Sequence, residues 1–456
     1  MMKKYEKYAE TDQSWISPAP AHWEYVRAKR LFDNPKEKNI GNKESNILSL
    51  TLKGVINNDK DNPIGLSPSD YATYQIFEKD DLVFKLIDLE NISTSRVGIV
   101  PERGIMSSAY IRFSAREEIN IRYFYMQYYD WWLRHIFNGL GAGVRQTLSA
   151  ADLLNIKIVV PPREEQDQIV RFLDYKISKI NSLIKGYQKQ IKLLKERRAN
   201  VIELAVTQGI DDSVELKDSG AHWLPKIPKH WNMVYSKKLF AQRKDKAFPG
   251  DIQLTSSQKY GIVSQDEYMR IEGRRLTVVM TGADILKHVG KGDFVISMRS
   301  FQGGLEYSYV EGKISSAYVM LIPDHEKVYD EYFKWLLKSK SYIKALQGTS
   351  DLVRDGQALR YANFAKVSLP EIPLDEQKAI AEYIESEVNK IDKALPFFQK
   401  QIDILREYRT RLISDVVTGQ IDVRDEVIPE YTAVEDEPEQ TEETEESEGE
   451  ENADEC

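Results

Sequence analysis

The sequence predicts an α+β protein in which two mixed α/β globular domains are joined by two long helices that pair as an antiparallel coiled coil. Three observations predict this fold class. The chain has 456 residues, which is too long for a single hydrophobic core. It contains an internal repeat with a period near 210 residues. Each copy of the repeat ends in a long, uninterrupted helical pattern.

The repeat keeps its order along the chain. Pro-Ala-His-Trp at residues 20–23 recurs as Pro-Lys-His-Trp at 228–231, an offset of 208 residues. Glu-Gln at 165–166 recurs at 376–377, where the offset has grown to 211. Loop insertions between two copies of one fold produce a drift of this size. The sequence therefore predicts an internal pseudo-twofold repeat.

The first 150 or so residues of each copy predict a mixed α and β domain. Apolar runs at 81–86, 97–100 and 294–298 predict strands, and Gly, Asn and Pro separate them. One helical stretch follows in each copy, at 121–137 and at 329–346. The two globular parts differ from each other more than the following segments do, which suggests one architecture that presents two different surfaces.

A helix of about 45 residues is predicted after Pro161-Pro162 and again after Pro373. Proline followed by acidic residues favours a helix start, because it suits the first turn and the positive end of the helix dipole. Such a helix is roughly 65 Å long, and two matched apolar stripes in one chain can bury each other. The first predicted seam comprises Leu173, Ile177, Ile180, Ile184, Tyr187, Ile191, Leu194, Arg198, Val201 and Ala205. The second seam, 211 residues later, comprises Ile384, Val388, Ile391, Leu395, Phe398, Ile402, Leu405, Arg409, Leu412 and Val416.

Two features interrupt the seams. Arg198 and Arg409 place charge at matched positions, where each either reaches solvent or a nearby acid, or offers a docking point for a partner. Pro396 removes one helical hydrogen bond, and its counterpart Lys185 stands beside Gly186, which predicts a kink or break in the second helix at least.

The acidic balance of the chain is local. The net charge is −9, but residues 430–456 hold 14 Asp and Glu and no Lys or Arg, so the rest of the chain carries +5. This segment has almost no large apolar residues and is predicted to be disordered. It acts either as a solubilising end, which we favour, or as a mimic of DNA phosphates. The predicted limits of the parts are 1–160, 161–210, 211–372, 373–425 and 426–456.

Several classes of chemistry have no support in the sequence. It contains no GxxxxGK[ST] phosphate loop and no HExxH zinc motif, and its one cysteine is Cys456. We expect no catalytic residues, no metal and no cofactor. No apolar stretch is long enough to span a membrane, and the charged start does not resemble a signal peptide, so we expect a cytoplasmic protein.

The order of globular part, long helix, globular part, long helix resembles the specificity subunit of type I restriction-modification enzymes. The resemblance covers residues 1 to about 425. Its most specific segments are PPREEQDQIVRFLDYKISKINSLI (161–184), PLDEQKAIAEYIESEVNKID (373–392) and SGAHWLPKIPKHW (219–231). GAGVRQTLSAADL (141–153) also resembles the passage from reader to helix, whereas the second copy departs from it with LVRDGQALRYANF (352–364).

The resemblance implies two target-recognition domains that each read half of a split DNA sequence, with the paired helices setting the gap. It also implies partners: double-stranded DNA, two methyltransferase subunits that methylate adenine with S-adenosylmethionine, and ATP-dependent restriction and translocase subunits. Two separated readers predict half-sites about one helical turn, ~34 Å, apart.

The DNA-contacting residues can only be nominated from residue type and polar or glycine-containing context. Most nominees would contact phosphate, since half or more of protein–DNA hydrogen bonds do, while Gln can read adenine and Arg guanine. The nominees are Lys53, Arg96, Arg103 and Arg145 in the first domain, and Gln258, Lys259, Arg274, Arg275, Arg299, Gln302 and Arg354 in the second.

Two other functions remain open. One is a bipartite DNA-binding regulator without methyltransferase partners, which copurification would distinguish. The other is a coiled-coil scaffold, which predicts no specific affinity for DNA.

Overall fold

The structure, a computed structural model, describes residues 3–16, 18–59, 68, 70–87, 89, 94–140, 147–273, 285–297, 300–349 and 359–435. The chain divides into two compact units. Unit 1 comprises residues 1–188 and 399–456, and unit 2 comprises residues 189–398. Two long helices, α4 (Arg163–Gln208) and α10 (Leu374–Val417), each contribute to both units.

The described residues of unit 1 form short strands, short α-helices and 3-10 turns. Its strands are β1 (Tyr8–Ala9), β2 (Ala19–Pro20), β3 (Glu24–Arg27), β4 (Phe32–Asp33), β5 (Leu48–Thr51), β6 (Gly54–Asn57), β7 (Gln75–Phe77), β8 (Leu82–Phe84), β9 (Val97–Ile99), β10 (Gly104–Met106), β11 (Ile111–Ala115) and β12 (Lys157–Val160). Its helices are η1 (Ala28–Arg30), η2 (Tyr71–Thr73), α1 (Ile121–Leu133), α2 (Ile136–Leu140) and α3 (Ala150–Asn155).

In the described residues of unit 2 the strands match those of unit 1, whereas the helices differ. Its strands are β13 (Leu216–Ala221), β14 (Leu224–Pro228), β15 (Asn232–Tyr235), β16 (Phe240–Gln242), β17 (Leu254–Ser257), β18 (Gly261–Ser264), β19 (Lys287–Val289), β20 (Phe294–Ile296), β21 (Glu306–Tyr307), β22 (Gly312–Ile314), β23 (Val319–Pro323) and β24 (Ser368–Glu371). Its helices are η3 (Ser236–Lys238), α5 (Gln265–Glu272), α6 (Ser300–Gly303), α7 (Asp330–Leu336), α8 (Lys340–Gln347) and α9 (Tyr361–Phe364).

The sheets of the two units have the same topology. The four-stranded sheet of unit 1 has the order β4-β11-β8-β9, and that of unit 2 has the order β16-β23-β20-β21. The two-stranded pairs β1-β2, β12-β3, β5-β6 and β10-β7 likewise correspond to β13-β14, β15-β24, β17-β18 and β19-β22. All of these pairings are antiparallel. The predicted fold class and internal repeat are confirmed.

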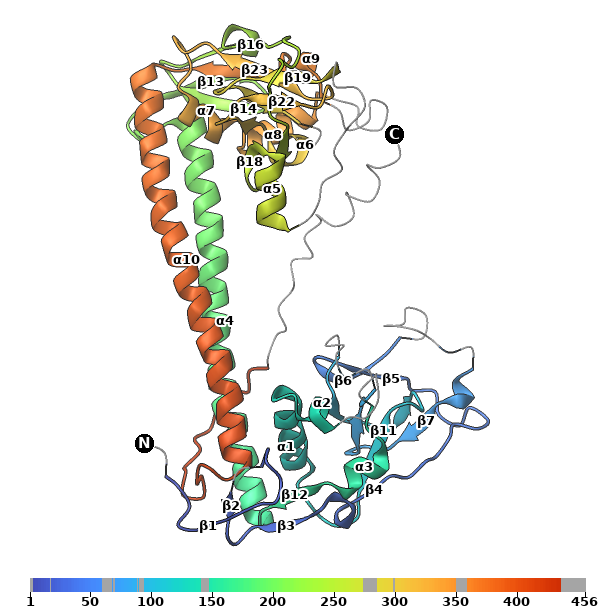
Figure 1. Cartoon of the computed structure of the whole chain (residues 1–456). Coiled ribbons are helices and arrows are strands. Elements are labelled where there is room, and N and C mark those ends of the chain that lie inside the picture. Colours follow the sequence, from blue (N-terminus) through green and yellow to red (C-terminus); the bar gives the residue numbers. More distant parts are fainter. Residues whose placement is uncertain are drawn as a thin grey trace. The chain divides into compact units, whose positions relative to one another are not determined.

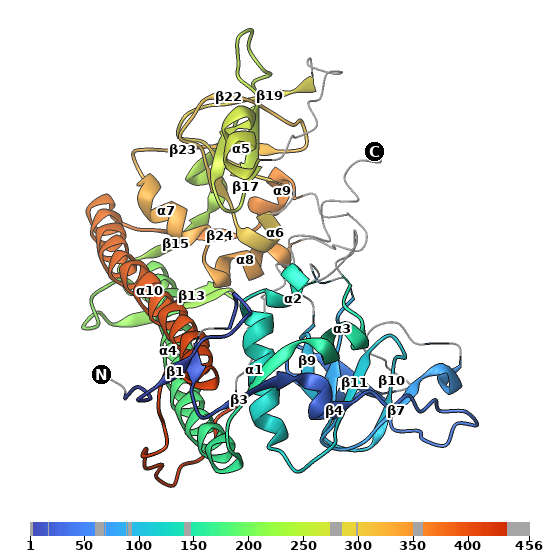
Figure 2. The same cartoon turned by 60° about the horizontal axis from the view of Figure 1, so that its bottom comes forward.

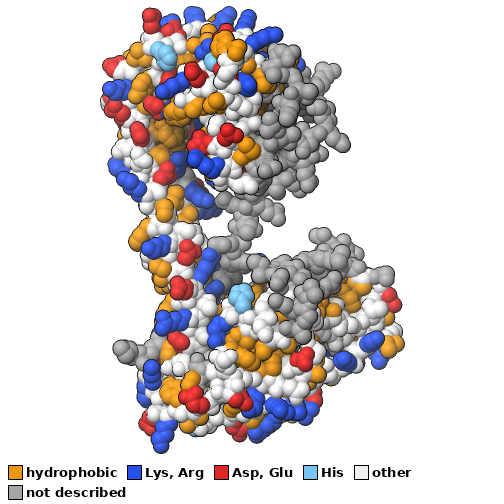
Figure 3. Space-filling model, viewed as in Figure 1, with side chains coloured by type: hydrophobic (Ala, Val, Ile, Leu, Met, Phe, Trp, Pro, Cys, Tyr) orange, Lys and Arg blue, Asp and Glu red, His pale blue; other side chains and the backbone are white. Residues whose placement is uncertain are grey.

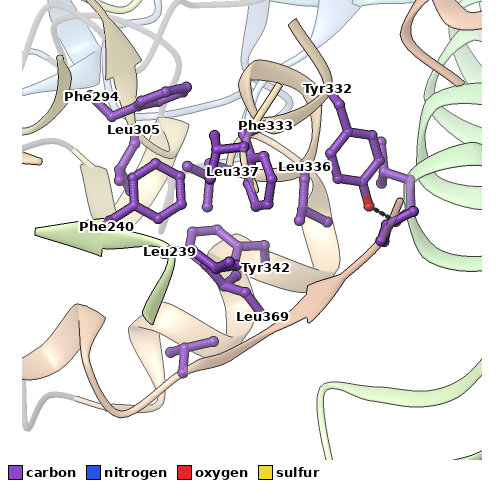
Figure 4. Close-up of a cluster of buried hydrophobic side chains, with 14 of the residues drawn as sticks. Leu239, Phe240, Phe294, Leu305, Tyr332, Phe333, Leu336, Leu337, Tyr342 and Leu369 are labelled. Carbon is purple, nitrogen blue, oxygen red and sulfur yellow. Dashed lines mark hydrogen bonds between the residues drawn. The ribbon is translucent and has the colours of Figure 1, made fainter. Parts of the chain in front are cut away.

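The core of each unit lies between its four-stranded sheet and the helices that follow the sheet in sequence. In unit 2 the cluster includes Phe240 and Phe294 from the sheet and Phe333 and Tyr342 from α7 and α8, all buried. Figure 4 shows these rings and the surrounding leucines directed toward one another. The anchoring tryptophans Trp23 and Trp231 are buried, as expected for core residues.

The helical stretches predicted at 121–137 and 329–346 are each two helices in the structure. In unit 1, α1 ends at Leu133, and His135 then adopts a positive φ of 55° before α2 begins. In unit 2, α7 ends at Leu336, and the Ser339 side chain caps α8 by accepting from the backbone of Tyr342. Apolar periodicity alone does not predict these breaks, because the segments on both sides of each break bury the same kinds of side chain.

The long helices α4 and α10 begin directly after the predicted proline signals and lie side by side in both Figure 1 and Figure 2. Of the kink or break predicted at Pro396, the break is absent, because α10 is continuous from Leu374 to Val417, and the kink stays a prediction. Buried seam residues on either side, Ile391 and Ile402, hold the helix in place across the proline. None of the described helices is long and apolar enough to cross a membrane.

The predicted disorder from residue 426 onward is wrong for residues 426–435. These residues form no helix or strand, but side chains of α4 hold their backbone by hydrogen bonds. Residues 436–456, which carry most of the acidic run, lie outside the described residues.

Candidate nucleic-acid interface

The repeated Glu of the Glu-Gln motif anchors the start of each long helix to its globular domain. In unit 1, Glu165 accepts from the indole nitrogen of Trp23 at 3.0 Å and lies 2.6 Å from Nε2 of His22. In unit 2, Glu376 lies 3.0 Å from the indole nitrogen of Trp231 and 2.7 Å from Nε2 of His230. The repeated residues are therefore structural. They fix each globular domain to the start of the long helix that follows it.

The Gln of the same motif bridges a backbone amide and a backbone carbonyl, and Gln377 donates in addition to the Lys327 carbonyl at 2.7 Å. Gln166 accepts from the Asn120 amide through Oε1 at 2.9 Å and donates to the Pro161 carbonyl through Nε2 at 2.9 Å. Gln377 accepts from the Tyr329 amide at 2.8 Å and donates to the Ile372 carbonyl at 2.8 Å. Each glutamine thus links the start of the long helix to the N-cap residue of α1 or α7 in its own unit.

In each unit, a tyrosine of the globular domain bonds the C-terminal end of the long helix that belongs to the other copy of the repeat. Tyr123 donates from its hydroxyl to the carbonyl of Val417 near the end of α10, at 2.9 Å. Tyr332 donates to the carbonyl of Val206 near the end of α4, at 2.8 Å. Figure 4 shows the Tyr332 hydroxyl directed at its partner. Burial raises the pKa of both tyrosines, which keeps the hydroxyls as donors.

The long helices pair antiparallel with matched polar contacts in each unit. In unit 2, Arg198 donates to Asp392 at 2.9 Å, and in unit 1 Arg409 donates to the Oδ1 of Asn181 at 2.9 Å. These two contacts are related by the 211-residue offset. Moving forward along α4 from Asn181 to Arg198 goes with moving backward along α10 from Arg409 to Asp392, so the helices are antiparallel. Both arginines of the seam thus bond within the chain: Arg198 meets an acid, as the first of the two interpretations expected, and Arg409 meets an amide.

All eighteen apolar residues of the two predicted seams lie in α4 or α10, and none is exposed; Val201 is partly buried, and Ala205, Leu412 and Val416 are buried. Leu173, Ile180, Ile184, Ile384, Val388, Ile391 and Ile402 are buried. Ile177, Tyr187, Ile191, Leu194, Leu395, Phe398 and Leu405 are partly buried.

An ion pair joins sheet segments of each globular domain at the aspartate that directly precedes β8 or β20; the pair is buried in unit 1 and partly buried in unit 2, where its arginine follows β16. In unit 1, Arg112 of β11 donates to Asp81 at 2.5 Å, and both side chains are buried. In unit 2, Arg243 donates to Asp293 at 2.6 Å. Burial raises the pKa of Asp81, while Ser114 and Arg112 oppose the rise. The pair is a structural element of the sheet, so these arginines are not available to DNA.

The described nominees of unit 1 fall in three different settings. Lys53 lies exposed in the turn between β5 and β6. Arg103 lies at the surface but pairs with Glu78 and Glu44. Arg96 is 2% exposed and donates to the backbone carbonyls of Lys85 and Ile87. Only Lys53 and Arg103 are therefore accessible to a phosphate.

The described nominees of unit 2 are Gln258, Lys259 and Gln302, and all three are exposed. Gln258 and Lys259 occupy the turn between β17 and β18, at the place that Lys53 occupies in unit 1. Lys259 lies 3.5 Å from Glu272. Gln302 lies on α6. The remaining nominees, Arg145, Arg274, Arg275, Arg299 and Arg354, lie outside the described residues.

A groove of about 330 Å³ in unit 2 was not predicted. It is lined by Gln258 and Lys259 together with aromatic residues and the two lysines Lys334 and Lys338 of α7 and its following turn. Nζ of Lys334 lies 4.8 Å from the ring of Tyr307 and 4.7 Å from that of Tyr309. The i, i+4 spacing of the two lysines was the only feature of the sequence that pointed to this groove. The tyrosines could not be assigned to it, because they come from a separate strand region.

Basic residues do not gather into one patch on the face shown in Figure 3. Lys and Arg side chains are interspersed with Asp and Glu in both units. The described residues contain no group of three or more His, Cys, Asp or Glu that could hold a metal ion.

The comparisons with known proteins agree with this geometry. The profile of the type I restriction modification DNA specificity domain matches residues 20–193. The chain thus resembles type I restriction-modification specificity subunits, most directly over residues 20–193. Two proteins of Methanocaldococcus jannaschii are similar. The putative type I restriction enzyme MjaX specificity subunit is 25% identical over 288 residues, which cover 61% of this chain and 63% of that protein. The MjaVIII specificity subunit is 24% identical over 282 residues, or 59% and 63% of the two proteins.

The matched stretch thus spans 63% of the length of both curated relatives. Solved structures resemble the fold of this chain over a larger share of its length. The HsdS subunit from Thermoanaerobacter tengcongensis has a TM-score of 0.51 at 16% identity, covering 90% of this chain and all of that one. A chain from a structure of type I R-M complex assembly and conformational transition has a TM-score of 0.58 at 14% identity, covering 88% and 98%.

Proposed function

We propose that this chain is the specificity subunit of a type I restriction-modification complex and reads a bipartite DNA sequence through two target-recognition domains. The observation that carries the proposal is the duplication. One sheet topology and one anchoring motif occur twice, joined by an antiparallel helix pair, while the exposed turns of the two copies differ. Two copies of one scaffold with unlike turns suit two unlike half-sites.

The proposed parts are target-recognition domains at 1–160 and 211–372, long helices at 161–210 and 373–425, and an acidic tail at 426–456. In this proposal the helix pair sets the spacing of the half-sites. The chain performs no chemistry itself. It positions two adenine methyltransferase subunits and the restriction and translocase subunits on cytoplasmic DNA. Pseudo-twofold symmetry supports two partners of one kind.

The proposed DNA contacts are the exposed nominees Lys53, Arg103, Gln258, Lys259 and Gln302. The five nominees outside the described residues remain proposed on sequence alone. Arg96 is left out, because its guanidinium is buried and bonded to backbone. The turn that follows β5 in unit 1 and β17 in unit 2 contributes a lysine in both copies, which supports this turn as a contact in each half-site.

The experiment that tests the function is coexpression with the methyltransferase encoded beside this gene, followed by mapping of methylated adenines in host DNA with and without the chain. We expect a stable complex and methylation at one split sequence that depends on this chain. A chain that binds split DNA alone, without a methyltransferase, would favour the regulator. A complex without DNA specificity would favour the scaffold.

The exposed lysines give a finer test of the same proposal. Replacing Lys259 by Ala should weaken DNA binding by the methyltransferase complex several-fold at all sequences and lower the slope of log K against log salt by about one, because one phosphate contact is lost. Lys53→Ala should do the same in unit 1. Lys226→Ala, an exposed lysine on β14, is the matched control and should leave the slope unchanged.

A further inference from the structure

Residues 426–435 form an extended segment, here called the strap, that lies along α4 in unit 1. Gln168 donates from Nε2 to the Glu426 carbonyl at 2.8 Å, where the strap begins. The rings of Tyr175 and Tyr431 lie 5.2 Å apart. Farther along α4, the Ser178 hydroxyl accepts from the Val434 amide at 2.9 Å. The strap therefore follows the helix in the same direction as the helix runs.

Asn181 joins the strap to the helix pair. Its Nδ2 donates to the Val434 carbonyl at 2.9 Å, and its Oδ1 accepts from Arg409 of α10 at 2.9 Å. Ser178 and Asn181 are buried although both are polar, and both are satisfied by strap backbone. A buried polar side chain that bonds backbone on one side and a second helix on the other indicates a built contact.

The same face of α10 in unit 2 carries no such arrangement. The counterparts of Gln168, Tyr175, Ser178 and Asn181, each 211 residues later, are Ala379, Ser386, Asn389 and Asp392, and all four are exposed. Asp392 accepts from Arg198 just as Asn181 accepts from Arg409. A carboxylate, however, has no donor for a strap carbonyl. The amide at 181 is thus the choice that serves both the seam and the strap.

We propose that the strap covers one of two dyad-related helix faces and so makes the two binding sites for methyltransferase subunits unequal. This inference rests on the proposed function. Two partners of one kind must bind what the two copies share, and the copies share their helices far more than their readers. The strap lies on one of those helices and not on its counterpart. The α10 face of unit 2 therefore takes the first methyltransferase, and the α4 face of unit 1 takes the second after the strap has moved.

The strap is built to be displaced. Its contacts to α4 are mostly to its backbone, and most of its side chains are exposed, Val427 to 90%. Backbone contacts of this kind are each worth a modest net amount. A protein partner with a larger surface can replace them.

The test is a titration of the full chain with its methyltransferase subunit, read by native mass spectrometry. In the wild type we expect the second methyltransferase to bind about tenfold more weakly than the first, which is the cost of releasing one or two net hydrogen bonds. The double variant Ser178→Ala, Asn181→Asp removes the strap bonds and keeps an acceptor for Arg409. In this variant the two affinities should agree within about threefold, through tighter binding of the second subunit.

Asn389→Ala, at the exposed counterpart of Ser178, is the matched control and should leave the inequality in place. Release of the strap can be followed independently, because cleavage after Glu430 by a glutamate-specific protease should become faster in the double variant. Equal affinities in the wild type, or an unchanged inequality in a variant whose strap is freely cleaved, would overturn the inference and leave the proposed function standing. Failure of all forms to bind any methyltransferase would overturn both.

Discussion

Units 1 and 2 share their framework and differ at their edges. The sheet order, the Glu-Gln anchor and an Arg-Asp ion pair at matched aspartates occur in both, although the two arginines come from different strands. The segments after the paired strands β5-β6 and β17-β18 differ, because β18 runs directly into α5 in unit 2, whereas no helix follows β6 at residues 58 and 59 of unit 1. The strap adds a contact to one unit only. What is repeated in this molecule supports the fold, and what is not repeated is where function should be sought.

Loss of an anchoring tryptophan should have the largest effect. Trp231 is fully buried and bonded to Glu376, so Trp231→Ala should lower the free energy of unfolding by about 3–5 kcal/mol. Trp23→Ala should cost a similar amount in unit 1. Urea unfolding followed by circular dichroism measures both. Tyr235→Ala, at a mostly exposed position, should stay within about 0.5 kcal/mol. A small effect at one tryptophan alone would break the equivalence of the units.

Loss of the arginine from each Arg-Asp ion pair should give the next largest difference in stability between the units. Arg112→Met leaves Asp81 buried without its cation and should cost about 3–5 kcal/mol. Arg243→Met should cost less, because Arg243 is more exposed and shares its charge with Asp245.

Burial already raises the pKa of Asp81, and loss of Arg112 raises it further. A raised folded pKa means stability that is lost as pH rises, so the Arg112→Met deficit should be larger at pH 8 than at pH 5. Urea unfolding at the two pH values tests this, and a deficit that shrinks at pH 8 would contradict it.

The two seam arginines should show the smallest and most diagnostic difference. Arg198 and Asp392 are both partly exposed, so Arg198→Ala should cost about 0–1 kcal/mol. Arg409→Ala removes a donor from the buried Asn181 and should cost about 1–3 kcal/mol. Unfolding midpoints of the two variants give the comparison. Equal costs would mean that the strap does not stiffen its side of the helix pair.

The fold could be predicted because its signals repeat. A heptad seam carried twice at one offset cannot be a chance pattern, and the matched His-Trp and Glu-Gln residues marked the same junction in both copies. The break between α1 and α2 was missed, since His135 reaches a positive φ that no local residue pattern announced.

The candidate site was less predictable, because exposure of a single side chain depends on distant chain segments. Arg96 stands in a polar stretch that predicts a loop, yet carbonyls of Lys85 and Ile87 enclose it. The strap was predicted to be disordered from its composition. The composition of the strap carries no information about Ser178 and Asn181, which lie some 250 residues earlier in the chain and bond the strap backbone.

The order of the two letters in the Glu-Gln motif cannot be exchanged. The glutamate faces the indole and the imidazole at once, and in unit 1 also the Tyr5 hydroxyl, and only a carboxylate offers an acceptor oxygen to each side. Its neighbour faces one donor and one acceptor, which only an amide can serve. A transposed Gln-Glu pair would place an amide donor against a donor at the first position and a carboxylate acceptor against a carbonyl at the second. Hydrogen-bond direction alone therefore requires Glu before Gln in both copies of the repeat.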